Sequence, residues 1–376
     1  MTEPTTCEHP IVQLLPAGNR AQSTPARDHS AVGRVQGGDL FELGEAYIAG
    51  LWTTERLDEF MYRIFTSSKP RARLLGRARL LLRYADQFLF NRQNERRAFE
   101  VGIRHYDLGN ELFGAMLDPS MTYTCGYWAG ATTLQQAQEA KLDLICRKLD
   151  LRPGLRVLDL GCGWGNFARH AAERYGVHVT GITISQQQAH EARRRVAGLP
   201  VEIRLQDYRA VRETYDRIVS IEMIEAVGRK NLPTFYRVVD DRLSHDGLFV
   251  LQSITADIFS RTSDYRGDQY FAWILKHIFP NGYIPTQFEL SAPGSAALRI
   301  EDWQNLGHDY DQTLLAWADN FSRSWDRLKE RYGEGFRRRW EFYLLGCAAA
   351  FRANLVNVCQ IVYSRPGRGQ RYVPLR

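Results

Sequence analysis

The sequence predicts an α/β fold: a doubly wound parallel sheet that follows a small helical module. Short apolar segments alternate with helical ones from about residue 156 to residue 254, as in sheets built from strand–helix–strand units. A glycine-dense turn, Gly161-Cys-Gly-Trp-Gly165, connects the first apolar segment to a helix. Polar residues follow the next apolar segments at their carboxyl ends, where open parallel sheets bind ligands.

The elements are expected in the following order. Residues 1–36 are polar and lack periodicity, which predicts a flexible tail. Residues 37–100 are expected to form a small helical domain, and residues 101–376 the main domain. Strands are expected at 156–160, 177–182, 201–205, 217–221, 248–254 and 356–363, and helices at 134–149, 166–175, 185–196, 232–243, 311–331 and 334–353. An aromatic-rich insertion is expected at about 260–300.

Composition limits the class of protein. With 376 residues, 44% of them apolar and 24% charged, the chain is an ordinary globular protein with room for a catalytic domain and a smaller module. The six cysteines contain no C-x-x-C pair, so neither a metal site nor a disulfide framework is expected. No apolar run approaches the length of a membrane span, and no secretory leader is evident. We therefore expect a cytoplasmic protein, in which any membrane contact would be peripheral. No nucleic-acid partner is expected.

The segment 71–83 interleaves arginines and leucines at helical spacing. Such a basic amphipathic helix can lie on an anionic membrane surface. It can equally be a solvated helix whose leucines pack on the neighbouring domain. The formal net charge of +6 is compatible with an acidic partner surface, and the sequence leaves both interpretations open.

The glycine turn indicates the cofactor. Gly161, Gly163 and Gly165 tolerate positive φ and let the backbone close on a flat ligand. The helix that follows offers free N–H groups at its start. Dinucleotide-binding enzymes use a related turn, but G-x-G-x-G preceded by Asp159 favours S-adenosylmethionine (SAM).

The next two strand ends supply further candidates for binding this cofactor. Thr183 and Gln188 are neutral residues that can share the ribose hydroxyls, and Asp207 beside Tyr208 suits the adenine amino group and ring face. Ser185 is better explained as the N-cap of a helix.

The fourth and fifth strand ends are also polar. Glu222 and Glu225 follow the fourth strand, and Gln252, Ser253 and Ile254 come at the end of the fifth. Polar residues at the ends of otherwise apolar strands are unusual in a core, so the sequence predicts that they converge on one cleft.

Several motifs in order resemble the cyclopropane-fatty-acyl-phospholipid synthase family. They are the glycine motif, Leu43-Gly-Glu-Ala-Tyr-Ile-Ala-Gly-Leu-Trp52, His105-Tyr-Asp-Leu-Gly-Asn110, Met121-Thr-Tyr-Thr-Cys-Gly-Tyr-Trp128, Gly181-Ile-Thr-Ile-Ser185, Phe279-Pro-Asn-Gly282 and Gly307-His-Asp-Tyr310. The resemblance covers about residues 37 to 365. It implies a class I SAM-dependent methyltransferase fold in residues 101–376, Rossmann-like with a mostly parallel seven-stranded sheet. It also implies that residues 37–100 are a front module for lipid binding and dimerisation. Tyr123 and Thr124 then join the cofactor site.

The resemblance also implies a reaction. The π bond of a cis-unsaturated phospholipid acyl chain attacks the methyl group of SAM, and a base removes a proton so that a cyclopropane ring closes. In relatives the base is thought to be a bound bicarbonate ion. By motif position its ligands are Cys125, Glu225, Gln252, the backbone of Ile254, and Tyr310.

Two positions depart from the family pattern. Ala226 and Gln252 stand where histidines are usual, and a glutamine amide donates hydrogen bonds but cannot take up a proton. The departures leave alternatives open: the same alkylation ending in a methylene- or methyl-branched chain, a small-molecule C- or N-methyltransferase, or a lipid-surface protein that retains SAM affinity without turnover.

Overall fold

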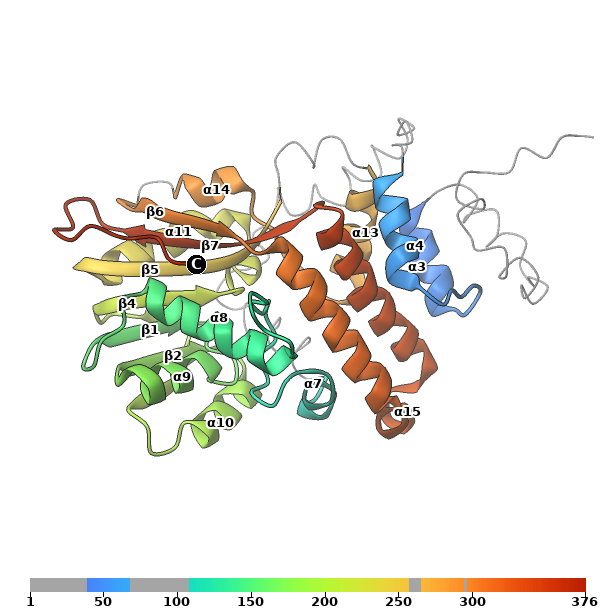
Figure 1. The fold of residues 1–376 in the computed structure, drawn as a ribbon, viewed down its shortest axis with the longest axis horizontal. Coiled ribbons are helices and arrows are strands. Elements are labelled where there is room, and N and C mark those ends of the chain that lie inside the picture. Colours follow the sequence, from blue (N-terminus) through green and yellow to red (C-terminus); the bar gives the residue numbers. More distant parts are fainter. Residues whose placement is uncertain (1–38, 68–107, 257–264, 294–295) are drawn as a thin grey trace, which may run out of the picture.

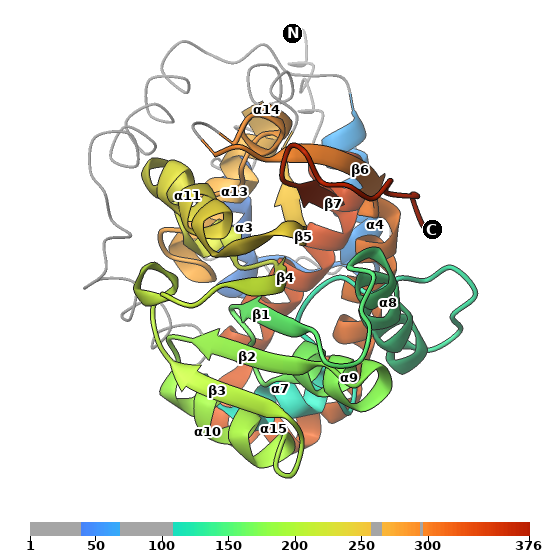
Figure 2. The ribbon, with the colours of Figure 1, turned by 90° about the vertical axis from the view of Figure 1, so that its left-hand side faces the viewer.

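The computed structural model describes residues 39–67, 108–256, 265–293 and 296–376, and its centre is a seven-stranded sheet (Figures 1 and 2). The strands are β1 (Arg156–Leu160), β2 (His178–Thr183), β3 (Val201–Leu205), β4 (Tyr215–Ile221), β5 (Leu243–Thr255), β6 (Arg299–Asn305) and β7 (Asn357–Ser364). Their order is β3-β2-β1-β4-β5-β7-β6. The first five are parallel, and β7 is antiparallel to β5 and β6. The predicted α/β fold with a mostly parallel sheet is confirmed.

The helices begin and end largely where the sequence predicts. Those described are α3 (Leu40–Ile48), α4 (Leu57–Thr66), α7 (Asn110–Met116), α8 (Leu134–Lys148), α9 (Asn166–Tyr175), α10 (Gln186–Arg195), α11 (Leu232–Arg242), α13 (Tyr265–His277), α14 (Gln287–Ser291) and α15 (Gly307–Arg352), with 3-10 turns η2 (Tyr208–Ala210), η3 (Ile224–Ala226) and η4 (Arg229–Asn231). The Ser185 side chain accepts the N–H of Gln188, so its predicted role as the N-cap of α10 is confirmed.

Alternate side chains of each strand face opposite sides of the sheet, and each side has its own helices (Figure 2). Val157 and Val250 lie in an apolar cluster with α8 and α9. Their chain neighbours Leu158 and Phe249 lie in a cluster with α11. Burial on both faces explains why these strands are apolar throughout. Because both faces of the sheet are buried, polar functional side chains are expected at the ends of the strands.

Helix α15 is a hairpin of two antiparallel arms (Figure 1). Gly333 divides it, with φ 73° and ψ 165°, well outside helical geometry. The two arms match the helices predicted at 311–331 and 334–353. The left-handed φ at Gly333 suits a residue without a side chain, which is why the helix breaks there.

The N-terminal helices α3 and α4 pack against α13 and α15 in one continuous apolar core. Gly44 lets α3 lie close to α13, because a Cβ at this position would be only 2.6 Å from Nε1 of Trp273. The division of the chain at residue 100 stays a prediction, and the front helices share their core with the hairpin.

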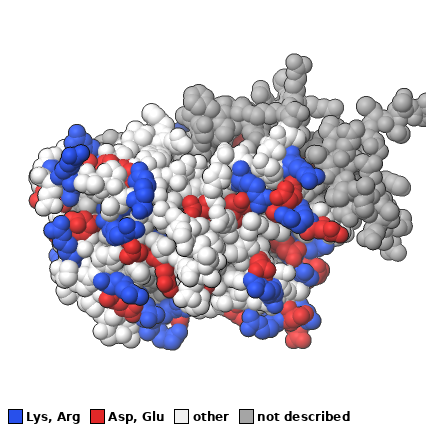
Figure 3. Space-filling model, viewed as in Figure 1, with Lys and Arg blue, Asp and Glu red and all other residues white. Residues whose placement is uncertain are grey.

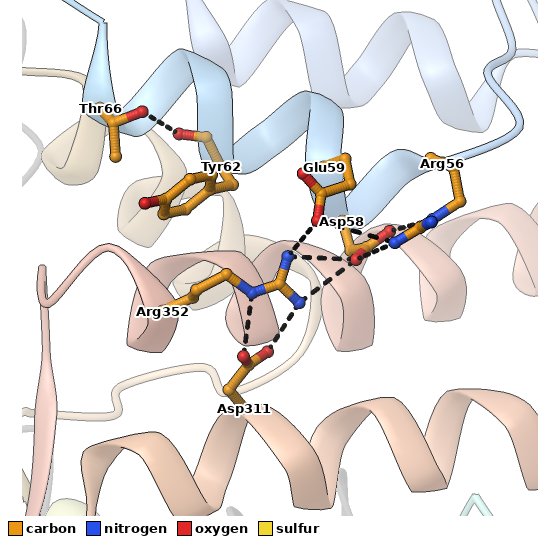
Figure 4. A network of polar contacts seen from close by, with 7 residues as sticks. All are labelled: Arg56, Asp58, Glu59, Tyr62, Thr66, Asp311 and Arg352. Carbon is orange, nitrogen blue, oxygen red and sulfur yellow. Dashed lines mark hydrogen bonds and ion pairs between the residues drawn. The ribbon is translucent and has the colours of Figure 1, made fainter.

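A network of ion pairs and hydrogen bonds connects α4 to the hairpin (Figure 4). Arg352, at the end of α15, donates to Asp311 near the start of the same hairpin at 2.9 Å and 3.0 Å. It also donates to Asp58 at 3.2 Å and to Glu59 at 2.8 Å, both in α4. Arg56 closes the network by donating to Asp58.

The structure differs from the expectations in two places. Strand β6 was not predicted; its residues are partly charged, and it lies at the edge of the sheet beside β7. Strand β5 begins five residues earlier than the 248 expected. The predicted tail, the basic segment 71–83 and His105 lie outside the described residues.

Candidate active site

A cleft opens at the carboxyl ends of β1, β2, β3 and β4. Its lining includes nine of the ten residues predicted to bind the cofactor: Tyr123, Thr124, Asp159, Gly161, Gly163, Thr183, Gln188, Asp207 and Tyr208. Gly165 is the exception. It has φ 83° and precedes α9, and a Cβ there would lie 3.2 Å from Cβ of Ala192 in α10. Gly165 thus contributes to the packing of the turn, and the cofactor roles of all ten residues remain predictions.

The glycine turn provides a close backbone approach to the cleft. Gly161 has φ 81°, and a Cβ there would lie 2.5 Å from Cγ of Met223. Gly163 has φ 55°, and a Cβ there would meet no described heavy atom within 4 Å. The first glycine is thus required by packing and conformation, whereas the second borders open space where a ligand can approach the backbone.

Asp159 provides a buried negative group in the cleft. Its side chain is 2% exposed, and its Oδ2 atom has no hydrogen-bond partner among the described residues. Burial raises the pKa of Asp159 to about 7, although nearby Lys141 opposes the rise. A cationic ligand would supply the missing partner and favour the ionised carboxylate.

Lys141 is a cleft residue that the sequence analysis missed. It projects from α8, is almost fully buried, and donates from Nζ to Oγ1 of Thr124 at 2.8 Å. Burial lowers the pKa of Lys141 to about 8. In the sequence it is one polar residue among many in this helix, so no local signal marks it.

The predicted ribose and adenine residues interact within the protein. Thr183 donates to Oε1 of Gln188 at 2.9 Å, which fixes both side chains at the end of β2. Asp207 accepts the backbone N–H and a guanidinium N–H of Arg209, each at 2.9 Å. The Arg209 guanidinium lies 4.7 Å from the centre of the Tyr208 ring. These contacts orient the polar edge of the cleft.

A second group of polar residues surrounds Glu222, which lies directly after β4. Its Oε1 accepts the backbone N–H of Cys125 at 2.9 Å and Nε2 of Gln252 at 2.7 Å. Its Oε2 accepts the hydroxyl of Tyr310 at 2.7 Å. Three of the five predicted catalytic residues therefore meet on one carboxylate. From the sequence, Glu222 is predicted only to be a polar residue at a strand end.

Glu225 accepts a hydrogen bond from the backbone of Ile254, a fourth predicted catalytic residue. Its Oε1 accepts the backbone N–H of Ile254 at 2.6 Å and the hydroxyl of Ser253 at 3.1 Å. Its Oε2 is buried and has no hydrogen-bond partner among the described residues. Burial and the neighbouring charge of Glu222 raise the pKa of Glu225 to about 8, so this carboxyl group keeps its proton near neutral pH.

Gln252 is oriented from behind by Gln360 of β7. Gln360 donates from Nε2 to Oε1 of Gln252 at 2.9 Å, and both side chains are fully buried. The amide oxygen of Gln252 is therefore occupied, and its NH₂ group points to Glu222. This assignment of the amide follows from the hydrogen-bond network. Gln360 gave no signal in the sequence because it lies within an apolar strand.

The Cys125 thiol has a packing role. Burial and the nearby carboxylate of Glu222 raise its pKa well above the ordinary range. The thiol is therefore neutral, and the residue contributes its backbone N–H to the site. A neutral thiol also avoids reaction with an alkylating cofactor, since the thiolate is the nucleophile.

Comparison with known proteins decides the family. Residues 93–361 match the family model described as mycolic acid cyclopropane synthetase. The chain belongs to this family.

Relatives in this family support the match over most of the chain. Cyclopropane-fatty-acyl-phospholipid synthase from Escherichia coli is 44% identical over 341 residues, which cover 88% of this chain and 87% of the relative. Tuberculostearic acid methyltransferase UfaA1 from Mycobacterium tuberculosis is 35% identical, with coverage of 87% and 79%. Family membership confirms the resemblance that the sequence motifs indicate.

Solved structures give the same result for the fold. The mycolic acid cyclopropane synthase CmaA1, complexed with SAH and CTAB, has a TM-score of 0.68 at 32% identity, covering 71% of this chain and 98% of that one. Coclaurine N-methyltransferase also has a TM-score of 0.68, but at 23% identity this likeness concerns the fold alone.

Proposed function

We propose that this family member transfers a one-carbon unit from SAM to the cis double bond of a phospholipid acyl chain and closes a cyclopropane ring. The observation that carries the proposal is the position of two partly buried carboxyl groups: Glu222 lines the cleft that contains the glycine turn, and Glu225 follows it in the next 3-10 turn. The 44% identity to the cyclopropane-fatty-acyl-phospholipid synthase of Escherichia coli supports a phospholipid acyl chain as the acceptor.

SAM, when bound, supplies an electrophilic methyl group on a sulfonium cation. The residues of the chain fit this cofactor. The open backbone at Gly163 admits its flat groups, and the unpartnered Oδ2 of Asp159 suits its positive charge. Thr183 and Gln188 are held at the end of β2, where they can bind ribose hydroxyls.

Aromatic side chains surround the polar cluster. The ring centres of Tyr123 and Trp317 are 5.0 Å apart, and those of Tyr310 and Trp317 are 5.9 Å apart with an edge-on geometry. Aromatic faces stabilise cations through their quadrupoles, and alkylation of a double bond creates a carbocation. Buried apolar surroundings also exclude water that would capture that cation.

The acceptor implies contact with a membrane surface. No helix in the described part of the chain is long and apolar enough to cross a bilayer. On the face shown in Figure 3, basic and acidic side chains of the described residues are interspersed and form no extended area of one sign. We assign peripheral contact with an anionic inner membrane surface to the basic segment 71–83, from its sequence alone. Changing Arg71, Arg73 and Arg77 to Glu should weaken vesicle binding at low salt, and unchanged binding would exclude this assignment.

A homodimer formed through the front module, on the cytoplasmic side of the membrane, completes the proposal. The family resemblance supports this arrangement. Light scattering of the whole chain measures the number of subunits. A monomer would exclude this arrangement.

A vesicle assay tests the proposed reaction. The protein is incubated with SAM and vesicles that contain cis-monounsaturated phosphatidylglycerol, and the fatty acids are analysed by mass spectrometry. The expected product is heavier by one methylene unit and resists mild hydrogenation that saturates alkenes. A product that is reduced readily would be a methylene branch. Absence of any lipid product, with turnover of a soluble amine, would assign the enzyme to the small-molecule methyltransferases.

A further inference from the structure

The structure places a side-chain carboxylate among residues that the family resemblance assigns to a bicarbonate ion. Cys125, Gln252 and Tyr310 are three of those five ligands, and all three donate to Glu222. A carboxylate and a bicarbonate ion present the same pair of oxygens to hydrogen-bond donors. Because these donors are already paired with Glu222, they do not fit a separate bicarbonate ion in this geometry.

We propose that Glu222 is the catalytic base of this enzyme and that the enzyme does not require bicarbonate. The proposal rests on the proposed function, because it names the proton acceptor for the ring closure. It concerns a residue that the sequence analysis left without a role.

The position of Glu222 suits a group that meets the substrate. Glu222 lines the same cleft as Asp159 and Gly161, whereas Glu225, Gln252 and Tyr310 are not among the residues that line it. Of its two oxygens, Oε1 accepts two hydrogen bonds and Oε2 accepts one. Since each carboxylate oxygen has two acceptor sites, Oε2 retains one for an incoming proton.

The backbone at Glu222 is unusual. Its φ is 51°, in the left-handed region that glycine adopts freely and a residue with a Cβ adopts at a cost. Non-glycine residues in this conformation occur often at functional sites, where the surrounding structure holds them in place. Here three donors and the bond from the Glu222 N–H to the Gln252 carbonyl, at 2.8 Å, hold the residue.

Glu222 and Glu225 differ in their protonation near neutral pH. The pKa of Glu225 is about 8, raised by burial and by the charge of Glu222, so near neutral pH Glu225 is protonated. Burial also raises the pKa of Glu222, while its three hydrogen-bond donors and Lys141 lower it. The pair therefore carries a single negative charge, and the donors favour its location on Glu222. A buried carboxylate with a raised pKa is a stronger base than one in water.

Ring closure forms two carbon–carbon bonds and breaks one carbon–sulfur bond and one C–H bond. The alkene π electrons form a carbon–carbon bond to the methyl carbon, and the bond between that carbon and sulfur breaks with its electron pair remaining on sulfur. A C–H bond of the transferred carbon then breaks. Its electrons form the second carbon–carbon bond of the ring, and its proton goes to Oε2 of Glu222. Glu222 returns the proton to water after the product leaves.

Two substitutions test the proposal in the whole chain. Glu222→Gln keeps the shape but removes the proton acceptor. Glu222→Gly removes the side chain, suits the positive φ, and frees the three partners for an added ion. Each variant is assayed with SAM and vesicles in buffer purged of carbon dioxide and in the same buffer with bicarbonate. Glu173→Gln, in an exposed ion pair with Arg169, is the matched control.

The expected results distinguish Glu222 from a bicarbonate ion as the catalytic base. Wild type and the control form the ring at the same rate in both buffers. Glu222→Gln loses at least about 100-fold in rate, the usual contribution of a positioned base, while its SAM affinity by calorimetry is unchanged. Glu222→Gly regains at least about tenfold in rate when bicarbonate is added. Binding of ¹³C-labelled bicarbonate, followed by NMR, should be seen with Glu222→Gly and not with wild type.

Two outcomes would overturn the proposal while the proposed function stands. One is a wild-type enzyme that stops without bicarbonate and recovers with it. The other is a Glu222→Gln variant that forms the ring at the wild-type rate. A wild-type protein that produces no alkylated lipid in either buffer would instead overturn the proposed function, and this proposal with it.

Discussion

Arg352, the last residue of α15, and Asp58, the second residue of α4, form a charge-assisted contact that joins the front helices to the hairpin. The Asp58 side chain is only 7% exposed and that of Asp311, the other main partner, 14%. Removing the guanidinium leaves both carboxylates short of a partner in a mostly buried place. We therefore expect Arg352→Ala to lower the free energy of unfolding by about 2–4 kcal/mol, measured by urea denaturation.

An exposed ion pair provides the control for this substitution. Arg323 and Asp319 are paired one turn apart in the same hairpin, with side chains 70% and 61% exposed. Arg323→Ala should change the stability by less than about 0.5 kcal/mol. If both substitutions cost the same, the Arg352 network does not fasten the front helices.

Alanine substitutions at two glycines distinguish the effect of a steric clash from the effect of backbone conformation alone. Gly161 and Gly130 both have positive φ, 81° and 77°, but only at Gly161 would a Cβ collide, 2.5 Å from Cγ of Met223. Gly130→Ala should lower the free energy of unfolding by about 1 kcal/mol, because of the backbone conformation alone. Gly161→Ala should lower it by more. It should also weaken SAM binding at least tenfold, because Met223 lines the cleft and must move. Calorimetry with SAM measures the difference, and equal SAM affinity in both variants would exclude Gly161 from the cofactor site.

SAM binding should depend on pH through Asp159. In the free protein the pKa of this carboxyl group is about 7, raised by burial. A cationic cofactor binds the ionised form better, so binding lowers that pKa and releases a proton. The affinity should rise about tenfold or more between about pH 5.5 and pH 7.5. Asp159→Asn should bind weakly and with little dependence on pH; an unchanged pH profile would show that SAM does not use this charge.

Apolar patterning and turn chemistry made most of the fold predictable. Strands buried on both faces read as apolar runs, and glycines at positive φ mark the turn after β1. Because parallel strands end at one edge of the sheet, the polar residues at those ends were expected to meet. Nine of the ten predicted cofactor residues do line one cleft.

The parts that the sequence did not predict depend on tertiary structure. Strand β6 is polar because it is at an edge, so it lacks the apolar pattern of a buried strand. Lys141 is ordinary in its own helix and becomes significant only because the cleft buries it. The role of Glu222 depends on a left-handed bend of one residue and on donors that lie 30 to 97 positions away along the chain. A single sequence contains no local signal for such contacts.

The raised pKa of Glu225 predicts how stability varies with pH. In the unfolded chain its carboxyl group ionises near pH 4.5, whereas in the fold it keeps its proton to about pH 8 because of burial and the charge on Glu222. The stability from this group is therefore fully present below about pH 4.5 and is lost as the pH rises to about 8, by up to about 1.4 kcal/mol per pH unit. Glu225→Gln retains the oxygen that accepts from Ile254 and cannot ionise, so its unfolding free energy should fall less between about pH 5 and pH 7.5.

Glu213→Gln is the control for that measurement. Arg204 and two backbone N–H groups lower the pKa of the exposed Glu213 to about 2, so above about pH 5 it is ionised in both states. Its substitution should shift the stability profile without changing the slope. Urea denaturation of the three proteins over this pH range gives the comparison. A Glu225→Gln slope equal to that of wild type would mean that Glu225 is ionised in the fold, and the single negative charge would then not be confined to Glu222.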